Sequence, residues 1–282
     1  MDKKVVIASD STCDLSHELV EKYGIKILPL SVNLGDKTYK DGVDIDPEYI
    51  YEHYENTGEL PKTAAANIFE FDTFIKENKG EGGMVLFTIS SAMSSTYNNA
   101  RLAAEEFDDV NVVDTENLST GGGLLVLAAA EMAAAGKSSA EIAEACRELA
   151  KRVDASFVID KLEFLYKGGR CSALEVLGAN LLQIKPCIVV RDGKMGVGKK
   201  YRGKYASTLE KYIAERIGDA SDIELDRIFV THAGCDEEVV QKCVEQVKAT
   251  APFKEVLVTR AGCTVSSHCG RNTLGVLFIR KA

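Results

Sequence analysis

The sequence predicts an α/β protein of two domains. Three observations support this prediction: the length of 282 residues, strand and helix patterns that alternate through the first half, and a hairpin signal in the second half. A chain of this length exceeds one small core and is short for three. We expect an N-terminal domain at 1–153, with a mostly parallel sheet covered by helices on both faces. The C-terminal α/β domain, at 154–282, is expected to hold a largely antiparallel sheet.

The elements of the first half follow from apolar runs and helix-start signals. The continuous apolar run at 84–88 is typical of a strand that is buried on both faces. Asp46-Pro47 is expected to begin a helix, because proline is tolerated at the first helical position. The expected strands are 5–8, 27–32, 84–88 and 110–113. The expected helices are 14–23, 46–54, 68–75, 97–106, 123–135 and 138–153.

The second half differs because it contains a strong hairpin signal. Asp192-Gly193 lies between two strand-like segments, and this dipeptide favours the tight turn of an antiparallel pair. The expected strands are 156–159, 185–191, 195–200, 227–231, 255–258 and 274–280. The expected helices are 207–217 and 236–248.

Composition excludes several classes of protein. The net charge of −9 argues against nucleic-acid binding, which needs a basic surface. No segment approaches the ~20 apolar residues of a membrane span, and the N-terminus lacks the apolar stretch of a signal peptide. The eight cysteines form no Cys-x-x-Cys pair and are expected to be reduced thiols. These features predict a cytoplasmic protein without stable membrane insertion.

Three motifs that suggest nucleotide or metal binding are incomplete. The segment 193–200 is similar to a phosphate-binding loop, but a lysine takes the place of the final Ser or Thr, so we interpret it as a hairpin turn. The segment 120–123 lacks the dinucleotide-binding spacing and indicates a tight turn that allows close helix packing. Cys263, His268 and Cys269 lack a fourth zinc ligand. We expect neither a cofactor nor a metal.

Ser90 and Ser91 begin a hydroxyl-rich segment between the strand at 84–88 and the next helix. Hydroxyls and free backbone N–H groups at a helix start can bind an anion without a fixed positive charge. Such a site suits a single carboxylate better than a polyphosphate. The sequence therefore predicts an anion site at this end of the strand.

Three further residues are candidates for the same site. Thr63 lies beside three alanines and is of interest only if it converges with Ser90 and Ser91. Arg170 follows a double glycine, where it could clamp an anion, lie in solvent or cap a helix. His268 lies among hydroxyls and a glycine, as in a ligand-facing loop, although a lone histidine is more often structural.

The same residues leave more than one function open. Ser91 or Ser90 as nucleophile and His268 as base would make a serine hydrolase for acyl esters or thioesters. Against this, the chain has no Gly-x-Ser-x-Gly motif and no acidic residue marked as the partner of the histidine. We therefore favour passive binding of a carboxylate, and a binder of some non-lipid carboxylate remains a third interpretation.

The chain resembles the DegV family along nearly its whole length. The motifs that carry this resemblance are Ala8-Ser9-Asp10-Ser11-Thr12-Cys13-Asp14-Leu15, Pro61-Lys62-Thr63, Ile89-Ser90-Ser91, Ser94-Ser95-Thr96-Tyr97, Lys167-Gly168-Gly169-Arg170-Cys171-Ser172, Asn180 to Pro186, and Ser267-His268. The chain departs from the family pattern at Ala64, where a second hydroxyl is lost, at Ser95, and at Arg271-Asn272.

The resemblance implies two α/β domains with a long-chain fatty acid between them and the acyl tail in an apolar tunnel. It implies that Thr63 and Ser91, with Ser90 adjacent, hold the carboxylate, and that Arg170 and His268 lie near the cleft. Characterised members are the fatty-acid-binding subunit of a fatty acid kinase. The resemblance therefore implies a carrier, not an enzyme, that presents the carboxylate to a separate kinase subunit.

Overall fold

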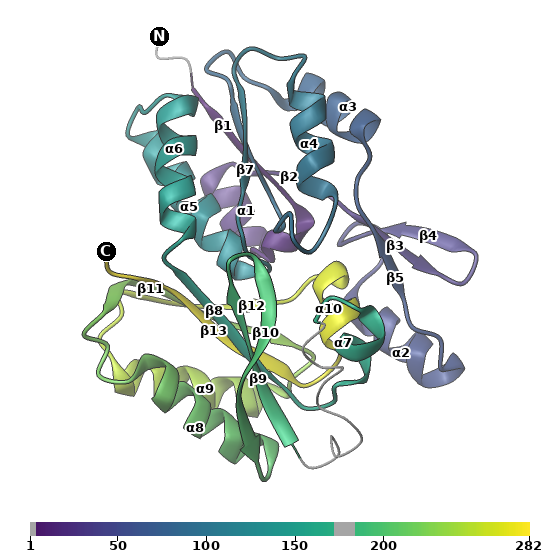
Figure 1. Cartoon of the computed structure of the whole chain (residues 1–282), viewed down its shortest axis with the longest axis vertical. Coiled ribbons are helices and arrows are strands. Elements are labelled where there is room, and N and C mark those ends of the chain that lie inside the picture. The colour runs from purple at the N-terminus through teal and green to yellow at the C-terminus, as the bar shows by residue number, and fades with distance from the viewer. Residues whose placement is uncertain (1–3, 172–183) are drawn as a thin grey trace.

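The computed structural model describes residues 4–171 and 184–282 and shows two α/β halves, one above the other in Figure 1. The upper half is built on a four-stranded parallel sheet, and the lower half on a six-stranded, largely antiparallel sheet. A small three-stranded sheet projects from the side of the upper half (Figure 1). The predicted fold class is confirmed.

Strands and helices are interspersed along both halves of the chain. The strands are β1 Val6–Asp10, β2 Lys26–Leu28, β3 Ser31–Leu34, β4 Lys37–Lys40, β5 Lys62–Ala64, β6 Met84–Thr88, β7 Val110–Asp114, β8 Val153–Ile159, β9 Ile184–Arg191, β10 Lys194–Arg202, β11 Ile223–Ala233, β12 Glu255–Arg260 and β13 Thr273–Arg280. The helices are the 3-10 turn η1 Ser11–Cys13 and α1 His17–Tyr23, α2 Pro47–Thr57, α3 Ile68–Asn78, α4 Thr96–Ala104, α5 Thr120–Ala134, α6 Ser139–Ala150, α7 Glu163–Gly168, α8 Tyr205–Ile217, α9 Glu237–Thr250 and α10 Cys263–Cys269.

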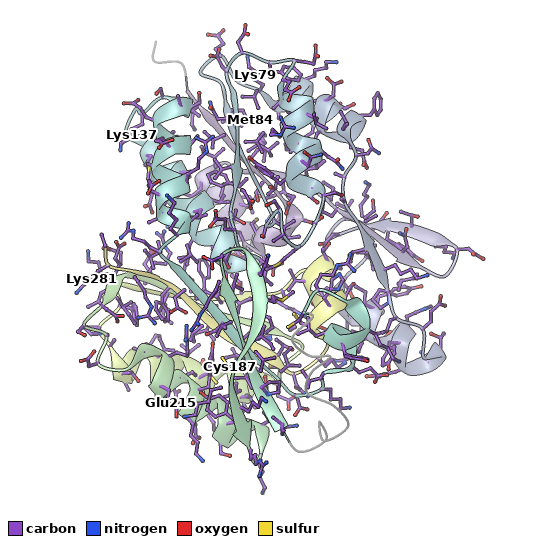
Figure 2. All side chains as sticks on the ribbon, viewed as in Figure 1. Lys79, Met84, Lys137, Cys187, Glu215 and Lys281 are labelled. Carbon is purple, nitrogen blue, oxygen red and sulfur yellow. The ribbon has the colours of Figure 1, made fainter. Side chains whose placement is uncertain are left out.

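The parallel sheet has the order β2-β1-β6-β7 and is covered on both faces. Val85 and Phe87 of β6 pack with α5 and α6 on one face. Met84 and Leu86 pack with α3 and α4 on the other, and Met84 is labelled inside the upper half in Figure 2. Successive strand residues point to opposite faces of the sheet. A strand that is covered on both faces therefore has a continuous run of apolar residues in its sequence.

The large sheet has the order β10-β9-β8-β13-β11-β12. The hairpin between β9 and β10 turns at Asp192 and Gly193, both in the left-handed region with φ of +50° and +72°. These angles are those of the tight hairpin turn that the dipeptide predicts. Helices α8 and α9 cover one face of this sheet. The other face packs against α5, so one apolar core joins the two halves.

We take the start of β8 as the division between the domains. One part of the N-terminal domain reaches across this division, because β3, β4, β5 and α2 lie beside α7 and α10 in Figure 1. Val32 and Tyr51 from this part share a core with Phe164 and Cys263. This packing brings β5 to the helix α10, although the two are about 200 positions apart in the chain.

Three local predictions are wrong. The strand expected at 27–32 is two strands in different sheets, because Pro29 lacks the N–H that a continuous ladder needs. The turn expected at 120–123 is the first turn of α5. The close packing expected there is present, since a Cβ at Gly123 would lie 2.8 Å from the Cys13 carbonyl oxygen. The loop expected around residue 268 is the helix α10.

Parts of two family motifs, Ser172 of one and 180–183 of the other, lie outside the described residues. Among residues 4–171 and 184–282, no helix combines the length and the apolar composition needed to cross a bilayer. In the same part of the chain, no group of three or more His, Cys, Asp or Glu side chains is arranged to hold a metal ion.

Candidate functional site

A largely apolar cavity lies between the two domains. It encloses about 610 Å³ of space between atoms, part of it open to solvent. Leu30, Ile89 and Leu118 line it from the N-terminal domain, and Leu165 and Val265 from the C-terminal domain. Apolar side chains of both domains therefore form most of its walls.

The polar end of this cavity is formed by Thr63 and His268. Thr63 lies on β5, which pairs with β3 in the small sheet, and His268 lies in the last turn of α10. Thr63 Oγ1 and His268 Nε2 are 2.8 Å apart. The structure therefore brings these two predicted residues together from opposite domains.

The imidazole of His268 is uncharged at neutral pH. Burial, and then the positive charge of Arg170, lower the pKa of His268 to about 4. Its buried Nδ1 has no hydrogen-bond partner among the described residues. A proton on Nε2 would be donated to Thr63 Oγ1, and the O–H of Thr63 would then be free to donate to an anion in the cavity. The pair can thus offer a neutral hydrogen-bond donor in place of a positive charge.

Arg170 lines the cavity next to this pair but is exposed. Gly169 forms the left-handed end of α7 at φ +67°, and the Arg170 Nη1 donates to the Gly168 carbonyl oxygen at 2.7 Å. A Cβ at Gly168 would lie 2.6 Å from His268 Nδ1. The first glycine of the pair therefore allows α7 to approach the imidazole, and the second ends the helix.

Ser90 and Ser91, which the sequence predicts at the carboxylate, are not among the residues that line the cavity. The buried Ser90 hydroxyl donates to the Gly193 carbonyl oxygen at 2.7 Å and so joins the β9–β10 hairpin to the N-terminal domain. Ser91 is exposed, and its backbone N–H faces the Asp114 carboxylate at 3.2 Å. The chain turns back at this point, since the N–H groups of residues 93 and 94 both bond to the Ser90 carbonyl.

The turn places Ser94 on the cavity wall instead. Ser94 Oγ lies 2.8 Å from Thr96 Oγ1, and the side chain is half-buried. Sequence reasoning missed it because five hydroxyl residues occur between positions 90 and 96, and their spacing does not show which one faces inward. His268 contacts Thr63 and neither Ser90 nor Ser91, so the pair required for a serine hydrolase is not formed by these residues.

Two buried carboxylates hold the helix that carries His268. Asp41 accepts from the backbone N–H groups of Cys263 and Thr264 at 2.6 and 3.0 Å. Asp14 accepts from the N–H of Gly262 at 2.8 Å and from the Ser119 hydroxyl. Free N–H groups at a helix start favour negative charge. These contacts fix α10 against the N-terminal domain and so position His268.

The ionisation of Asp14 predicts how the free energy of unfolding depends on pH. Burial raises the pKa of Asp14 from 3.8 to about 8, despite the hydrogen bonds from Ser119 and Gly262 that lower it. In the unfolded chain this carboxyl ionises near pH 4, so its contribution to the free energy of unfolding is largest below that pH and is lost as pH rises toward 8. Asp14→Asn keeps a hydrogen-bonding side chain that cannot ionise.

We expect Asp14→Asn to flatten the decline in unfolding free energy between pH 4 and 8, measured by urea denaturation. The exposed Asp108→Asn variant is the control for losing one carboxylate elsewhere. An Asp14→Asn profile parallel to that of the Asp108→Asn variant would contradict the prediction.

The apolar space continues beyond the first cavity. A second cavity of about 380 Å³ shares Leu118, Val265 and Cys269 with the first and reaches Phe157 and Leu277 of the large sheet. The two spaces therefore lie side by side between the domains; Thr63 and His268 line only the first, whereas Ser119, Thr231 and His232 line only the second.

The fold and this site define a class of two-domain α/β protein with a largely apolar site between the domains. A family model described as "Uncharacterised protein, DegV family" matches residues 4–281. The chain belongs to the DegV family.

Curated and solved relatives extend this comparison. A DegV domain-containing protein of Caldanaerobacter subterraneus subsp. tengcongensis is 31% identical over 99% of this chain and 100% of its own. A structure described as fatty acid binding of a DegV family protein from Thermus thermophilus is 28% identical. It has a TM-score of 0.87 and covers 98% of this chain and 99% of its own. The structure of DegV, a fatty acid binding protein from Bacillus subtilis, is 28% identical, with a TM-score of 0.83 and coverage of 99% and 100%.

Proposed function

We propose that the protein binds a long-chain fatty acid between its two domains. The observation that carries this proposal is the Thr63–His268 pair in the wall of a largely apolar cavity, which lies next to a second cavity. The carboxylate would accept hydrogen bonds from Thr63 and Ser94, with Arg170 nearby. The tail would extend past Val265 into the second cavity. The fatty-acid-binding relatives at 28% identity support the same ligand class.

The energetics of this arrangement favour a fatty acid over a short polar acid. Each methylene buried in an apolar space contributes roughly 0.8 kcal/mol, so the tail supplies most of the affinity. The carboxylate contributes little net affinity but must be hydrogen-bonded, because burying it unpaired would be costly. The hydroxyls of Thr63, which the neutral imidazole of His268 contacts, and of Ser94 meet this need. They hold the carboxylate less firmly than a bidentate arginine would.

Hydrogen bonding by uncharged groups also suits a ligand that another protein is to modify. We propose that the protein acts as a carrier and presents the carboxylate to the catalytic subunit of a fatty acid kinase, which uses ATP in the cytoplasm. Weakly held carboxylate oxygens remain nucleophilic toward a phosphoryl donor. The exposed Arg170 at the cavity wall is then available at the face where a kinase would approach.

Ligand binding is tested on the purified protein. Mass spectrometry of a denatured sample is expected to find a long-chain fatty acid at close to one per chain. Protein that is ligand-free, and that also fails to bind oleate or palmitate in a calorimetric titration, would contradict the proposal. A small polar acid in the same spectrum would favour a non-lipid ligand.

The carrier role needs a separate test. With labelled ATP, the fatty-acid-loaded protein alone is expected to form no acyl phosphate, and phosphorylation is expected only when the catalytic subunit of a fatty acid kinase is added. Acyl phosphate formed by the protein alone would show that it is itself the catalyst. Labelling of Ser90 or Ser91 by a fluorophosphonate probe would instead support the interpretation of the protein as a serine hydrolase.

A further inference from the structure

A cluster of ion pairs joins the two domains on either side of α10. Glu48, in the first turn of α2, belongs to the N-terminal domain and pairs with Arg260 and Arg271 of the C-terminal domain. Arg260, then Arg271, lower the pKa of Glu48, so this carboxylate is charged at neutral pH. Arg260 ends β12 just before α10, and Arg271 follows the end of α10. One carboxylate therefore binds the chain on both sides of the helix that carries His268.

Arg271 lies along one face of α2, which is beside α10 in Figure 1. Its guanidinium carbon is 4.6 Å from the centre of the Tyr51 ring, and its Nε is 3.4 Å from a carboxylate oxygen of Glu55. Glu48, Tyr51 and Glu55 are spaced three and four residues apart, so they share a face of the helix. A cation over an aromatic ring is attracted to it. Because Tyr51 is buried in a core cluster, its ring gives Arg271 a fixed surface.

The position of His268 has to be enforced by contacts outside its own helix. Its Nδ1 is buried and has no hydrogen-bond partner among the described residues. A buried polar atom without a hydrogen bond is unfavourable, so the imidazole would become more stable by moving toward water. The helix α10 has only seven residues, and a helix this short is not stable by itself.

The contacts described so far restrain the two ends of α10 unequally. The two buried carboxylates bind N–H groups at its start, away from His268. Beyond its other end, the Asn272 carbonyl accepts from the N–H of Asp160 at 3.0 Å, but both residues belong to the C-terminal domain. Arg271, three residues after His268, ties this end to α2 of the N-terminal domain.

We propose that Glu48 is a positioning residue for the site that holds the carboxylate. By binding Arg260 and Arg271, it fixes both ends of α10 against the N-terminal domain. His268 is thereby kept against Thr63. The effect on a ligand rests on the proposed fatty-acid binding, whereas the effect on the position of His268 does not.

The proposal is tested first on the ligand-free protein, by measuring the pKa of His268 with NMR. Glu48→Gln is expected to raise this pKa by about one pH unit toward the ordinary value of 6.5, because a less restrained helix lets water reach the imidazole. The loss of a negative charge would by itself lower the pKa of a histidine, so the direction of the change separates the two causes. The chain has four histidines, and a His268→Gln variant assigns the resonance.

Two control variants remove a carboxylate without releasing α10. Glu52→Gln acts on the same helix, and Glu52 is exposed and pairs with no cation among the described residues. Glu131→Gln removes another ion pair between the domains, that with Arg227. Arg227 also binds Glu255 at the first residue of β12, whereas Arg260 is the last residue of this strand. At about 3.3 Å per residue the two ends are about 17 Å apart. Both controls are expected to leave the pKa of the imidazole unchanged.

The second measurement is the release of a fluorescent fatty acid. It is expected to be about three- to tenfold faster in Glu48→Gln than in the wild type, because partly exposed ion pairs each contribute little but two are lost together. Thermal unfolding verifies that the variant is folded. Glu48→Asp, one methylene shorter, is a milder second variant and is expected to shift the pKa of His268 in the same direction by less.

Two results would overturn the proposal. One is an unchanged pKa of His268 in folded Glu48→Gln and Glu48→Asp proteins, or an equal rise in either control. The other is unchanged release from Glu48→Gln in a protein whose wild type binds the fatty acid. If the wild type binds no fatty acid, the proposed function fails, and the NMR measurement still decides whether Glu48 positions His268.

Discussion

Thr63→Val is expected to weaken fatty-acid binding by about ten- to a hundredfold. A hydrogen bond to a charged group contributes roughly 1.5–3 kcal/mol, and each 1.4 kcal/mol is a factor of ten in affinity. Valine has almost the shape of threonine and is favoured in strands, so β5 should remain intact. The variant also leaves His268 Nε2 without its partner.

The measurement is displacement of a fluorescent fatty acid from the wild type and the variant. Thr38→Val is the matched control, because Thr38 lies on β4 of the same small sheet and its hydroxyl donates only to Asn33, at 2.7 Å. Equal affinity in wild type, Thr63→Val and Thr38→Val would place the carboxylate elsewhere.

Val265→Phe is expected to lower fatty-acid affinity more than Thr63→Val does. This loss should be confined to fatty acids with long acyl chains. Val265 lines both cavities, so a phenyl ring there would fill space that an acyl tail needs to extend from the first into the second. Each methylene kept out of the second cavity costs about 0.8 kcal/mol, and excluding four of them would lower affinity by roughly two hundredfold. Octanoate should bind the variant about as well as the wild type.

Comparing octanoate with stearate separates a blocked tail site from a misfolded protein. Val265→Ala, which enlarges the space beside residue 265, is the control and should bind stearate as well as the wild type does. Overpacking can destabilise a core, so Cys269→Phe from the same helix provides a second block. Stearate bound equally well by both phenylalanine variants would show that the tail does not enter the second cavity.

The fold was predictable because its signals are local. The apolar run of β6 indicates burial on both faces, and Asp192-Gly193 indicates the hairpin, since each depends only on backbone geometry and neighbouring residues. The small sheet was not predicted. Its strands have only three or four residues each, and Pro29 interrupts an apolar run that otherwise reads as one strand.

The candidate site was only partly predictable. Thr63 and His268 could be singled out by motif, but their contact depends on β5 crossing to α10, and no local pattern encodes that crossing. The segment that holds the hydroxyl cluster was singled out from the sequence, but a turn within it directs Ser90 to Gly193, leaves Ser91 in solvent and places Ser94 on the cavity wall.

The sequence by itself determined the α/β class, the order of most strands and helices, and the segments that carry the candidate residues. These depend on periodicity, turn chemistry and composition, which act over a few residues. Only the tertiary structure decided which hydroxyl faces the cavity and why His268 is uncharged. Those properties arise from burial and from contacts between distant segments, and neither is present in any local stretch of chain.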